Sequence, residues 1–337
     1  MSVRSREIHL ASRPDGMPSS ENFRLVETEL PDPRPGEVLV KNSYMSVEPY
    51  MRGRMYDVKS YVPPFELGAV LSGSAVGEVV ASSDPSLAAG SQVQSMLGWR
   101  EFAVAPAAAF TPIDTTRARA ADYLGALGVP GFTAWVGLHE IGGLKSDDVV
   151  FVSSASGAVG SIAGQLAKLA GARVIGSAGG PEKVRYLTED LGYDAAFDYK
   201  NGSMLTHLRE LAPRGIDLYF ENVGGDHLEA ALHALNPFGR IIACGMISQY
   251  NDPQPGPRNL TLIVGKRLTI RGFIVSDHFH RFPDFLRDVG GALADGRIQA
   301  PETVFEGIGR APEAFVALLT GGAGNLGKLL VSLDGRP

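Results

Sequence analysis

The segment from Ser153 to Gly164 has the residue types of a phosphate-binding turn. It reads SSASGAVGSIAG, follows the apolar run DVVFV and leads into a segment with helical spacing. Ser154, Gly157 and Gly160 have the spacing of a dinucleotide fingerprint, with serine in place of its first glycine. The middle glycine would let the backbone approach a pyrophosphate, which the amide groups and dipole of the following helix would stabilise. Such turns also serve packing alone, but between a strand and a helix the pattern favours a bound dinucleotide.

The end of the next apolar run indicates which dinucleotide this would be. NAD enzymes place an acidic residue there to hold the ribose 2′-hydroxyl, whereas this chain reads VIGSAGGPEKV, with no acid at the strand end. Lys183, at the start of the next expected helix, could pair with a 2′-phosphate, and Tyr199 could add a hydroxyl. The alternative for Lys183 is a solvated surface lysine. With the acid missing, the pattern favours NADP over NAD.

The residues that usually hold metals are sparse in this chain. Cys244 is its single cysteine, which excludes an internal disulfide and a cysteine-based zinc cluster. Among the histidines, His278 and His280 are the closely spaced pair, and their spacing does not put them on one face of a helix. A loop or strand could still present such a pair to a metal, but exposed histidines are the more common case. We therefore expect no metal site.

Length and charge limit the class of protein. A chain of 337 residues exceeds the size at which one hydrophobic core keeps growing, so two domains are expected. The net charge is −6 and there is no long run of Lys and Arg, which argues against a nucleic-acid or anionic-membrane partner. The N-terminal residues lack the apolar core of a signal peptide, and no stretch is apolar for long enough to span a bilayer. A cytoplasmic protein is the expectation.

The chain has two regions with different sequence patterns, and these patterns predict the strands and helices that position the candidate residues. Up to residue 123 the sequence is strand-like and rich in turns and prolines, which indicates a β-rich domain. From residue 124, short apolar runs alternate with helical segments, the signature of βαβ units and a parallel sheet. The tail returns to the first domain, so the predicted α/β fold has a nucleotide-binding domain at 124–299 inserted into a β-rich domain at 1–123 and 300–337.

Several segments resemble one family. The stretches GAVGSIAGQLAKLAGARVIGSAGGPEKVRYL, GIDLYFENVGG, CGMISQYN, RGFIVSD and LGVPGFTAW resemble the zinc-less medium-chain dehydrogenases/reductases, in the branch of prostaglandin/leukotriene reductases, alkenal double-bond reductases and curcumin reductases. EPYMRGRM and GGAGNLGKLLV extend the likeness over nearly the whole chain. The resemblance implies a GroES-like β-rich catalytic domain, an inserted Rossmann domain with a doubly wound parallel sheet, and NADPH-dependent reduction of the double bond of α,β-unsaturated carbonyl compounds. A homodimer is also implied.

The resemblance also implies a set of cofactor-binding residues. Lys183 and Tyr199 would hold the 2′-phosphate, and Asn222 would reach the ribose side. Four further residues would face the pyrophosphate: Gly157, Ala158, Val159 and Gly160. The remaining implied residues would line the rest of the cofactor, especially its nicotinamide half: Cys244, Gly245, Met246, Ile247, Ser248, Gln249, Tyr250, Phe273, Ile274, Val275 and Asn325.

Alkene reduction needs few side chains. A hydride passes from C4 of the nicotinamide to the β-carbon, and the resulting enolate needs a hydrogen-bond donor on its oxygen. Tyr250 is the first candidate for this donor, with a ribose hydroxyl of the nicotinamide sharing the task, while the α-carbon proton could come from solvent. Tyr50 is a candidate for positioning the substrate, and Tyr61 a candidate for the pocket wall. Arg52 could bind an acidic substrate or brace the fold.

Two alternatives to an alkenal/enone reductase stay open at this point. The same metal-free scaffold could serve a zinc-less quinone oxidoreductase. A non-catalytic NADPH-binding protein, with a structural or sensor role, is the alternative from a different class.

Overall fold

The computed structural model describes residues 3–252, 255–322 and 324–334, which form two compact units. Of the described residues, 3–124, 302–322 and 328–334 form a β-rich unit, and 125–301 and 324–327 form a parallel-sheet unit. The sequence-based boundaries and the roles attached to them stay a prediction. Among the described residues, no helix combines the length and hydrophobicity needed to cross a bilayer.

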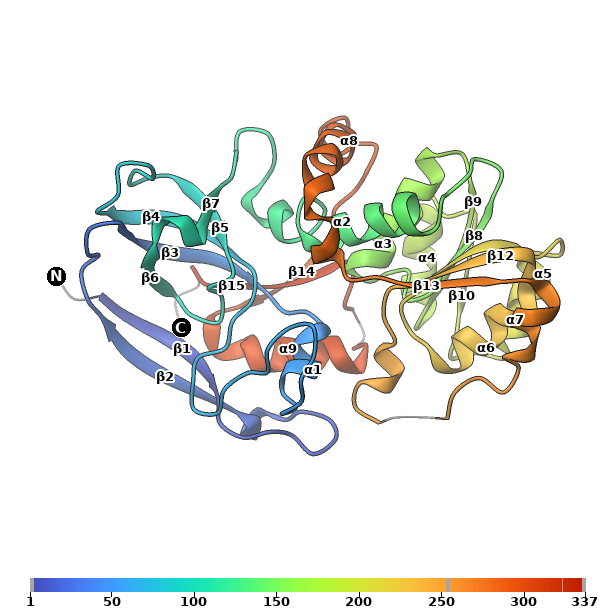
Figure 1. Cartoon of the computed structure of the whole chain (residues 1–337), viewed down its shortest axis with the longest axis horizontal. Coiled ribbons are helices and arrows are strands. Elements are labelled where there is room, and N and C mark those ends of the chain that lie inside the picture. Colours follow the sequence, from blue (N-terminus) through green and yellow to red (C-terminus); the bar gives the residue numbers. More distant parts are fainter. Residues whose placement is uncertain (1–2, 253–254, 323, 335–337) are drawn as a thin grey trace. The chain divides into compact units, whose positions relative to one another are not determined.

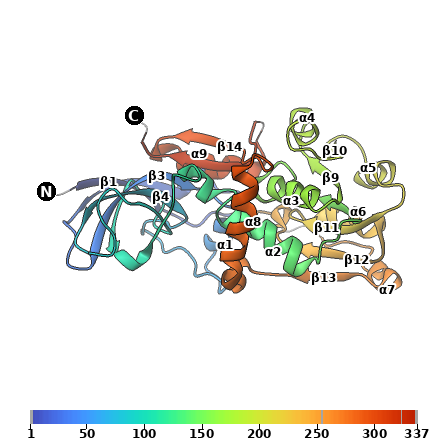
Figure 2. The ribbon, with the colours of Figure 1, turned by 90° about the horizontal axis from the view of Figure 1, so that it is seen from above.

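The parallel-sheet unit is a doubly wound α/β structure. Its described strands follow the order β10-β9-β8-β11-β12-β13 and every neighbouring pair is parallel. Helices α2 and α3 cover one face of this sheet, and α6 and α7 cover the other (Figures 1 and 2). The strands are β8 Val149–Val152, β9 Arg173–Ala178, β10 Ala195–Asp198, β11 Ile216–Glu221, β12 Leu235–Ala243 and β13 Thr269–Gly272. The helices are α2 Val129–Val136, α3 Ala158–Leu169, α4 Pro181–Glu189, α5 Met204–Leu211, α6 Gly225–Ala234, α7 Thr261–Lys266 and α8 Phe282–Ala294, with a π-helical segment η4 Gly137–Ile141 and the 3-10 segments η5 Ile247–Gln249 and η6 Val275–Arg281.

The local sequence explains where these elements begin and end. The central run of β8, Val150 to Val152, is completely buried, as expected for a strand covered on both faces. Helix α4 begins at Pro181, whose fixed φ suits a first helical residue. Gly171 and Gly192 follow the ends of α3 and α4 in the left-handed conformation, with φ of 93° and 70°. The predicted α/β class with a parallel sheet is confirmed.

The β-rich unit is built on a mainly antiparallel sheet, in which β14 and β15 pair in parallel. Its described strands follow the order β14-β15-β3-β4-β5-β7, β6 also pairs with β3, and β1 and β2 form a separate hairpin. The strands are β1 Val3–Leu10, β2 Phe23–Leu30, β3 Glu37–Ser46, β4 Ala75–Ser82, β5 Gln92–Ser95, β6 Phe102–Pro106, β7 Phe110–Pro112, β14 Glu302–Glu306 and β15 Lys328–Ser332. The helical segments are η1 Ser20–Asn22, α1 Tyr50–Arg54, η2 Ala107–Ala109, η3 Ala120–Leu124, η7 Ile308–Arg310 and α9 Ala311–Thr320.

An aromatic cluster lies at the centre of the β-rich unit. The buried indole of Trp99 stacks on Phe23 and meets Phe315 edge-on, with ring centroids 6.1 Å apart in each pair. Because Phe315 lies on α9, the C-terminal part of the chain packs into the same hydrophobic core as the first strands.

Candidate functional site

The carboxyl ends of the parallel strands place most of the predicted residues at one edge of the sheet. Parallel strands end at the same edge, and ligands of such sheets bind there. The residues predicted from the sequence follow these strand ends: Gly157 to Gly160 after β8, Lys183 after β9, Tyr199 after β10, Asn222 after β11, Cys244 to Tyr250 after β12 and Phe273 to Val275 after β13.

The glycine turn joins β8 to α3. Gly157 is the N-cap of α3 in an extended conformation, with φ −82° and ψ 176°. The amide of Ala155 donates to the carbonyl of Ser177 on β9 over 2.9 Å, which fixes the turn against the neighbouring strand. The first amide groups of a helix have no acceptors within it, so this end of α3 suits an anion.

Ser154 adopts a conformation that its residue type disfavours. Its φ is 50°, in the left-handed region. Glycine, the usual first residue of the fingerprint, reaches this region without cost. The sequence showed serine in place of the first glycine but gave no indication of the left-handed backbone, which costs about 1 kcal/mol or more for a non-glycine residue.

Close packing explains the glycines that follow. A Cβ atom at Gly160 would overlap the carbonyl oxygen of Ser154 and lie 2.8 Å from Cα of Ala155. A Cβ at Gly164 would overlap the ring of Tyr193, whose hydroxyl donates to the carbonyl of Gly160 over 2.7 Å. These glycines let α3 lie tightly against its surroundings.

Gly160→Ala is therefore expected to destabilise the protein by about 1–3 kcal/mol, because the neighbouring atoms are backbone and cannot yield. Urea unfolding measures this loss. Gly291→Ala in α8 is the matched control, since a Cβ there meets nothing within 4 Å and should stabilise the helix slightly. Equal stability of the Gly160 variant and the wild type would show that the turn can relax.

The segment before β15 is hydrogen-bonded to the glycine turn. The amide of Gly327 donates to the carbonyl of Ser156 over 2.8 Å, and Gly327 forms an isolated β-bridge with Gly157. Asn325 precedes Gly327 by two residues. Asn325 therefore belongs to a segment that contacts the glycine turn directly. The large separation of the two segments along the chain meant that the sequence could not reveal this contact.

The end of β9 has the features of a 2′-phosphate site. Lys183 is 8% exposed, and burial together with the charge of Lys200 lowers its pKa. A Cβ at Gly179 would lie 3.2 Å from the hydroxyl of Tyr199 and 3.1 Å from Cε of Lys200, so both side chains lie over this glycine. Asp198 accepts hydrogen bonds from the amides of Gly180 and Lys200, each at 3.0 Å. The charge of Lys183 and the side chains of Lys200 and Tyr199 thus meet near this strand end, where Asp198 is engaged by backbone amides and an added anion would offset the positive charge.

Lys200 is a residue that the sequence interpretation missed. It directly follows Tyr199 in the run AAFDYK, so the signal was present in the sequence. Its contribution depends on how the end of β10 lies beside the end of β9, which the parallel pairing of Asp198 with Ala178 determines.

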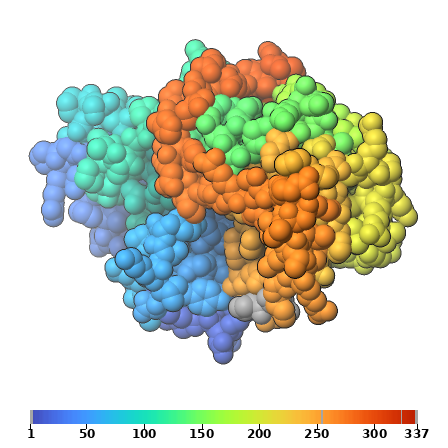
Figure 3. All heavy atoms as spheres, turned by 45° about the vertical axis from the view of Figure 1, so that its right-hand side comes forward, coloured from blue at the N-terminus to red at the C-terminus, as the bar shows by residue number. Residues whose placement is uncertain are grey.

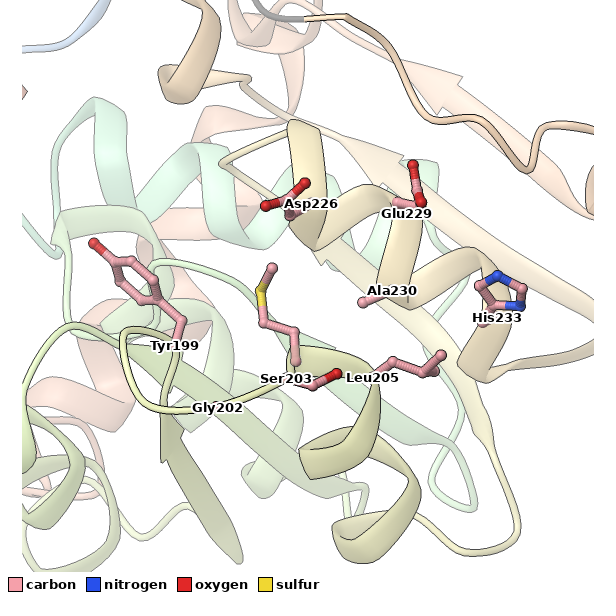
Figure 4. Close-up of a pocket in the computed structure, with 9 residues that line it drawn as sticks. Tyr199, Gly202, Ser203, Leu205, Asp226, Glu229, Ala230 and His233 are labelled. Atoms are coloured by element: carbon pink, nitrogen blue, oxygen red, sulfur yellow. The ribbon is translucent and has the colours of Figure 1, made fainter.

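A cavity of about 370 Å³ adjoins Tyr199 (Figure 4). It lies between the loop after β10 and helix α6, and Asp226, Glu229 and His233 project from that helix around it. Its other lining residues are Gly202, Ser203, Met204, Leu205 and Ala230. Tyr199 thus lies close to Gly179 at the end of β9 and also lines this cavity.

His227, in the first turn of α6, packs edge-on against the ring of Tyr199, with ring centroids 5.2 Å apart. It is buried, no described residue gives its Nε2 a hydrogen bond, and burial lowers its pKa to about 4. The imidazole is therefore neutral in the folded protein at neutral pH.

The buried imidazole should make stability depend on pH. Between pH 6.5 and about 4 the unfolded chain binds a proton that the folded chain does not, so the free energy of unfolding should fall by about 1.4 kcal/mol per pH unit on acidification. His227→Gln should reduce this slope in denaturant unfolding at pH 5 and 7, whereas the same change at the exposed His233 should not. Equal slopes in wild type and His227→Gln would contradict the assignment.

A buried network joins the ends of β8 and β11. One carboxylate oxygen of Glu221 accepts hydrogen bonds from the hydroxyls of Tyr219 (2.7 Å) and Ser153 (3.2 Å) and from the amides of Val223 (2.6 Å) and Gly224 (2.9 Å). The side chain of Glu221 is completely buried, and this burial raises its pKa. The network holds the two loops that meet at the centre of the sheet edge.

Asn222 contacts the same network. Its side-chain amide donates to the carbonyl of Ser153 over 2.8 Å, and its backbone amide donates to the hydroxyl of Ser153 over 2.9 Å. The side chain of Asn222 is thereby oriented by the strand end that begins the glycine turn. Glu221 and Ser153 were not predicted as site residues.

The loop after β12 is hydrogen-bonded to the loop after β11. The amide of Gly245 donates to the carbonyl of Glu221 over 3.1 Å, and Ser248 donates to the carbonyl of Val223 through its amide and its hydroxyl. A Cβ at Gly245 would lie 3.3 Å from the hydroxyl of Tyr250, so that hydroxyl lies against the backbone of this loop. Burial, aided by the charge of Glu221, raises the pKa of the Cys244 thiol to about 12, which excludes a thiolate at neutral pH.

Tyr50 and Tyr61 belong to the β-rich unit. The hydroxyl oxygen of Tyr50 is buried, and burial, aided by the charge of Glu48, raises its pKa well above the ordinary value. Glu48 itself is buried and accepts from Ser46 over 2.8 Å and from Lys328 over 3.2 Å. Tyr61 is 63% exposed. The roles of both tyrosines stay predictions.

Arg52 braces the β-rich unit. Its guanidinium is completely buried, lies over the ring of Tyr56 at 4.1 Å, and donates to the carbonyl of Gly16 and the hydroxyl of Tyr56 over 2.6 and 2.7 Å. These contacts favour the structural role over the binding of an acidic substrate.

Potential metal ligands are dispersed in the part of the chain that the structure describes. No group of three or more His, Cys, Asp or Glu is placed there to hold a metal ion. His278 and His280 lie in η6 with ring centroids 6.3 Å apart and no third ligand among the described residues. The absence of a metal from the reaction stays a prediction.

A Rossmann sheet joined to a β-rich unit is the architecture of medium-chain dehydrogenases/reductases, and comparisons with known proteins agree with it. Residues 6–113 match the N-terminal domain of oxidoreductase, and residues 158–290 match the zinc-binding dehydrogenase family. The NADPH-dependent curcumin reductase of Escherichia coli and the NADP(+)-dependent 2-alkenal reductase of Nicotiana tabacum are each 40% identical to this chain, covering 98% of it and 98% of their own length. The crystal structure of CurA from Vibrio vulnificus in complex with NADPH has a TM-score of 0.92 and 40% identity, covering 98% of this chain and 100% of its own.

The chain belongs to the medium-chain dehydrogenase/reductase superfamily, in the branch of alkenal, prostaglandin and curcumin reductases. The resemblance noted in the sequence is confirmed.

Proposed function

We propose that this protein uses NADPH to reduce the carbon–carbon double bond of α,β-unsaturated aldehydes and ketones. The observation that carries the proposal is the end of β9, which has no acidic residue of its own: Lys183 is buried there under the electrostatic influence of Lys200, and the side chains of Tyr199 and Lys200 lie over Gly179, an arrangement that suits the 2′-phosphate. Full-length similarity to an NADPH-dependent curcumin reductase and an NADP(+)-dependent 2-alkenal reductase supports the cofactor and the substrate class.

Different residues at the sheet edge would bind different parts of the cofactor. The amides of Ala158 to Gly160 would face the pyrophosphate, since they begin α3. Asn222, held by Ser153, would reach the ribose side. The loop from Cys244 to Tyr250, the segment from Phe273 to Val275 and Asn325 would line the nicotinamide half. NADPH, when bound, supplies a hydride from C4 of its nicotinamide.

Tyr250 would donate a hydrogen bond to the substrate oxygen. This oxygen gains negative charge as the β-carbon accepts hydride, and a donor placed beforehand stabilises that charge most in the transition state. A tyrosine hydroxyl is protonated at neutral pH and can donate. Tyr50 would position the substrate and Tyr61 would form part of its pocket, while solvent could supply the proton to the α-carbon.

An NADPH-oxidation screen across short 2-alkenals, long enones and quinones tests the proposal. We expect turnover with alkenals and enones and formation of the saturated carbonyl product. Turnover with quinones alone would instead assign a quinone oxidoreductase. Tight NADPH binding without turnover of any electrophile would assign a non-catalytic binding protein.

Treatment with a chelator such as EDTA or 1,10-phenanthroline is expected to leave the rate of alkenal reduction unchanged. The described residues place no metal-binding cluster, and a tyrosine hydroxyl can stabilise the developing charge in place of a Lewis acid. The rate before and after dialysis against chelator is the measurement. Loss of activity that added zinc restores would contradict a metal-free reaction.

We also propose that the protein acts as a cytoplasmic homodimer. The segment with α7 and β13, coloured orange, lies at the surface in Figure 3. Strand β13 ends the sheet order with all its residues exposed, and Val264 of α7 is 80% exposed. An open strand edge beside an exposed apolar residue suits pairing with a second copy. Sedimentation equilibrium tests the dimer, and a monomer at micromolar concentration would contradict it.

A further inference from the structure

Arg54 connects helix α1 to the loop that carries Tyr61. Its Nε donates to the carbonyl of Pro63 over 2.9 Å, and one Nη donates to the hydroxyl of Ser72 over 3.0 Å. The guanidinium lies 4.0 Å from the ring centroid of Phe65, whose amide in turn donates to the carbonyl of Arg54 over 2.7 Å. A single side chain therefore holds the loop at three points after Tyr61.

The same guanidinium lies beside Tyr50. The two residues are four apart on α1, so their side chains lie on one face of the helix. The hydroxyl of Tyr50 is enclosed, and no described residue gives it a hydrogen bond of good geometry. Burial lowers the pKa of Arg54, and its electrostatic interactions with Tyr50 and Tyr61 act in the opposite direction.

We propose that Arg54 is a positioning residue for the acceptor substrate, because it aligns the Tyr61 loop with the Tyr50 hydroxyl. The inference rests on the proposed function, in which these tyrosines contact the substrate. Arginine suits the role because its planar fork offers separate donors in fixed directions while its face packs on an aromatic ring. A lysine could satisfy one of these partners but not all three.

The experiment compares Arg54→Ala and Arg54→Lys with wild type, using NADPH and a 2-alkenal. We expect kcat/KM for the alkenal to fall about 10- to 100-fold in both variants, mainly through KM, while the Kd of NADPH stays within about twofold. Cofactor binding is spared because the cofactor-binding residues at the sheet edge belong to the other unit. Adding Tyr50→Phe to Arg54→Ala should cost less than Tyr50→Phe costs in the wild type, since the two residues act together.

Arg6→Ala is the matched control. Arg6 lies on β1 in the same unit and donates through two nitrogens to Glu101, at 3.0 and 2.6 Å. Its loss should lower thermal stability without changing the KM for the alkenal. An equal rise in KM in the control would show that any lost arginine in this unit impairs the enzyme, which would overturn the proposal.

Limited proteolysis by chymotrypsin supplies a readout independent of activity. Cleavage after Tyr61 should accelerate at least fivefold in Arg54→Ala and stay unchanged in Arg6→Ala. If wild type reduces no alkenal or enone, the proposed function fails, while accelerated cleavage would still show that Arg54 holds the loop. Unchanged cleavage, or an unchanged KM for the alkenal in folded Arg54→Ala, would overturn the role of Arg54.

Discussion

Lys183→Ala is expected to weaken NADPH binding by about 10- to 100-fold, while NADH binding changes by about twofold at most. A hydrogen bond to a charged group contributes about 1.5–3 kcal/mol, and only NADPH carries the 2′-phosphate that receives it. Lys183 is buried and burial lowers its pKa, so a nearby anion favours its charged form. Titration of the fluorescence of each reduced cofactor gives the two dissociation constants.

Lys168→Ala is the control for loss of a lysine in the same unit. Lys168 pairs with Asp194 over 2.7 Å near the end of α3 and should not affect either constant. Equal binding of NADPH and NADH by the wild type would contradict the 2′-phosphate assignment. So would a parallel loss for both cofactors in Lys183→Ala.

The same assignment gives a direction for the effect of pH. Burial and the charge of Lys200 lower the pKa of Lys183, so the ammonium loses its proton at a lower pH than an exposed lysine does. NADPH binding should therefore weaken as the pH rises through this lowered value, while NADH binding stays level. The dissociation constants measured across the alkaline range give the profile.

Tyr250→Phe is expected to lower kcat by roughly 10²-fold and to leave the Kd of NADPH within about twofold. Loss of one donor to a developing oxyanion has about this effect in other enzymes, because the donor acts chiefly in the transition state. The variant keeps the ring and removes only the hydroxyl, whose oxygen lies near Gly245. Single-turnover rates with saturating NADPH separate this step from cofactor binding and product release.

Tyr186→Phe on α4 is the matched control, because it removes a half-buried hydroxyl from the same unit. Its kcat should equal that of the wild type. Unchanged turnover in Tyr250→Phe would remove Tyr250 from the chemistry. A rise in the Kd of NADPH large enough to explain the whole loss would assign it to cofactor binding alone.

Local patterns were sufficient to predict the parallel sheet and the strand-end residues. Buried runs such as Val150 to Val152, the Pro181 helix start and the glycines after α3 and α4 depend on neighbours in the sequence. Since parallel strands end at one edge of the sheet, identifying the strands was enough to predict that Gly157, Lys183 and Tyr199 lie at the same edge.

Contacts between distant segments could not be predicted in this way. The hydroxyl of Ser153 meets the carboxylate of Glu221 across 68 positions, and Gly327 returns to the glycine turn from the end of the chain. The left-handed Ser154 was also missed, because its residue type gives no sign of a positive φ. The functions of Tyr50, Tyr61 and Tyr250 stay predictions.

The most direct test of the account follows the transferred hydrogen. The protein is incubated with a 2-alkenal and NADPH deuterated at C4, and the product is analysed by NMR. We predict a saturated aldehyde with deuterium at the β-carbon and unlabelled hydrogen from solvent at the α-carbon. An allylic alcohol with deuterium on the carbon that bears the hydroxyl group, or no deuterium in any product, would contradict reduction of the double bond.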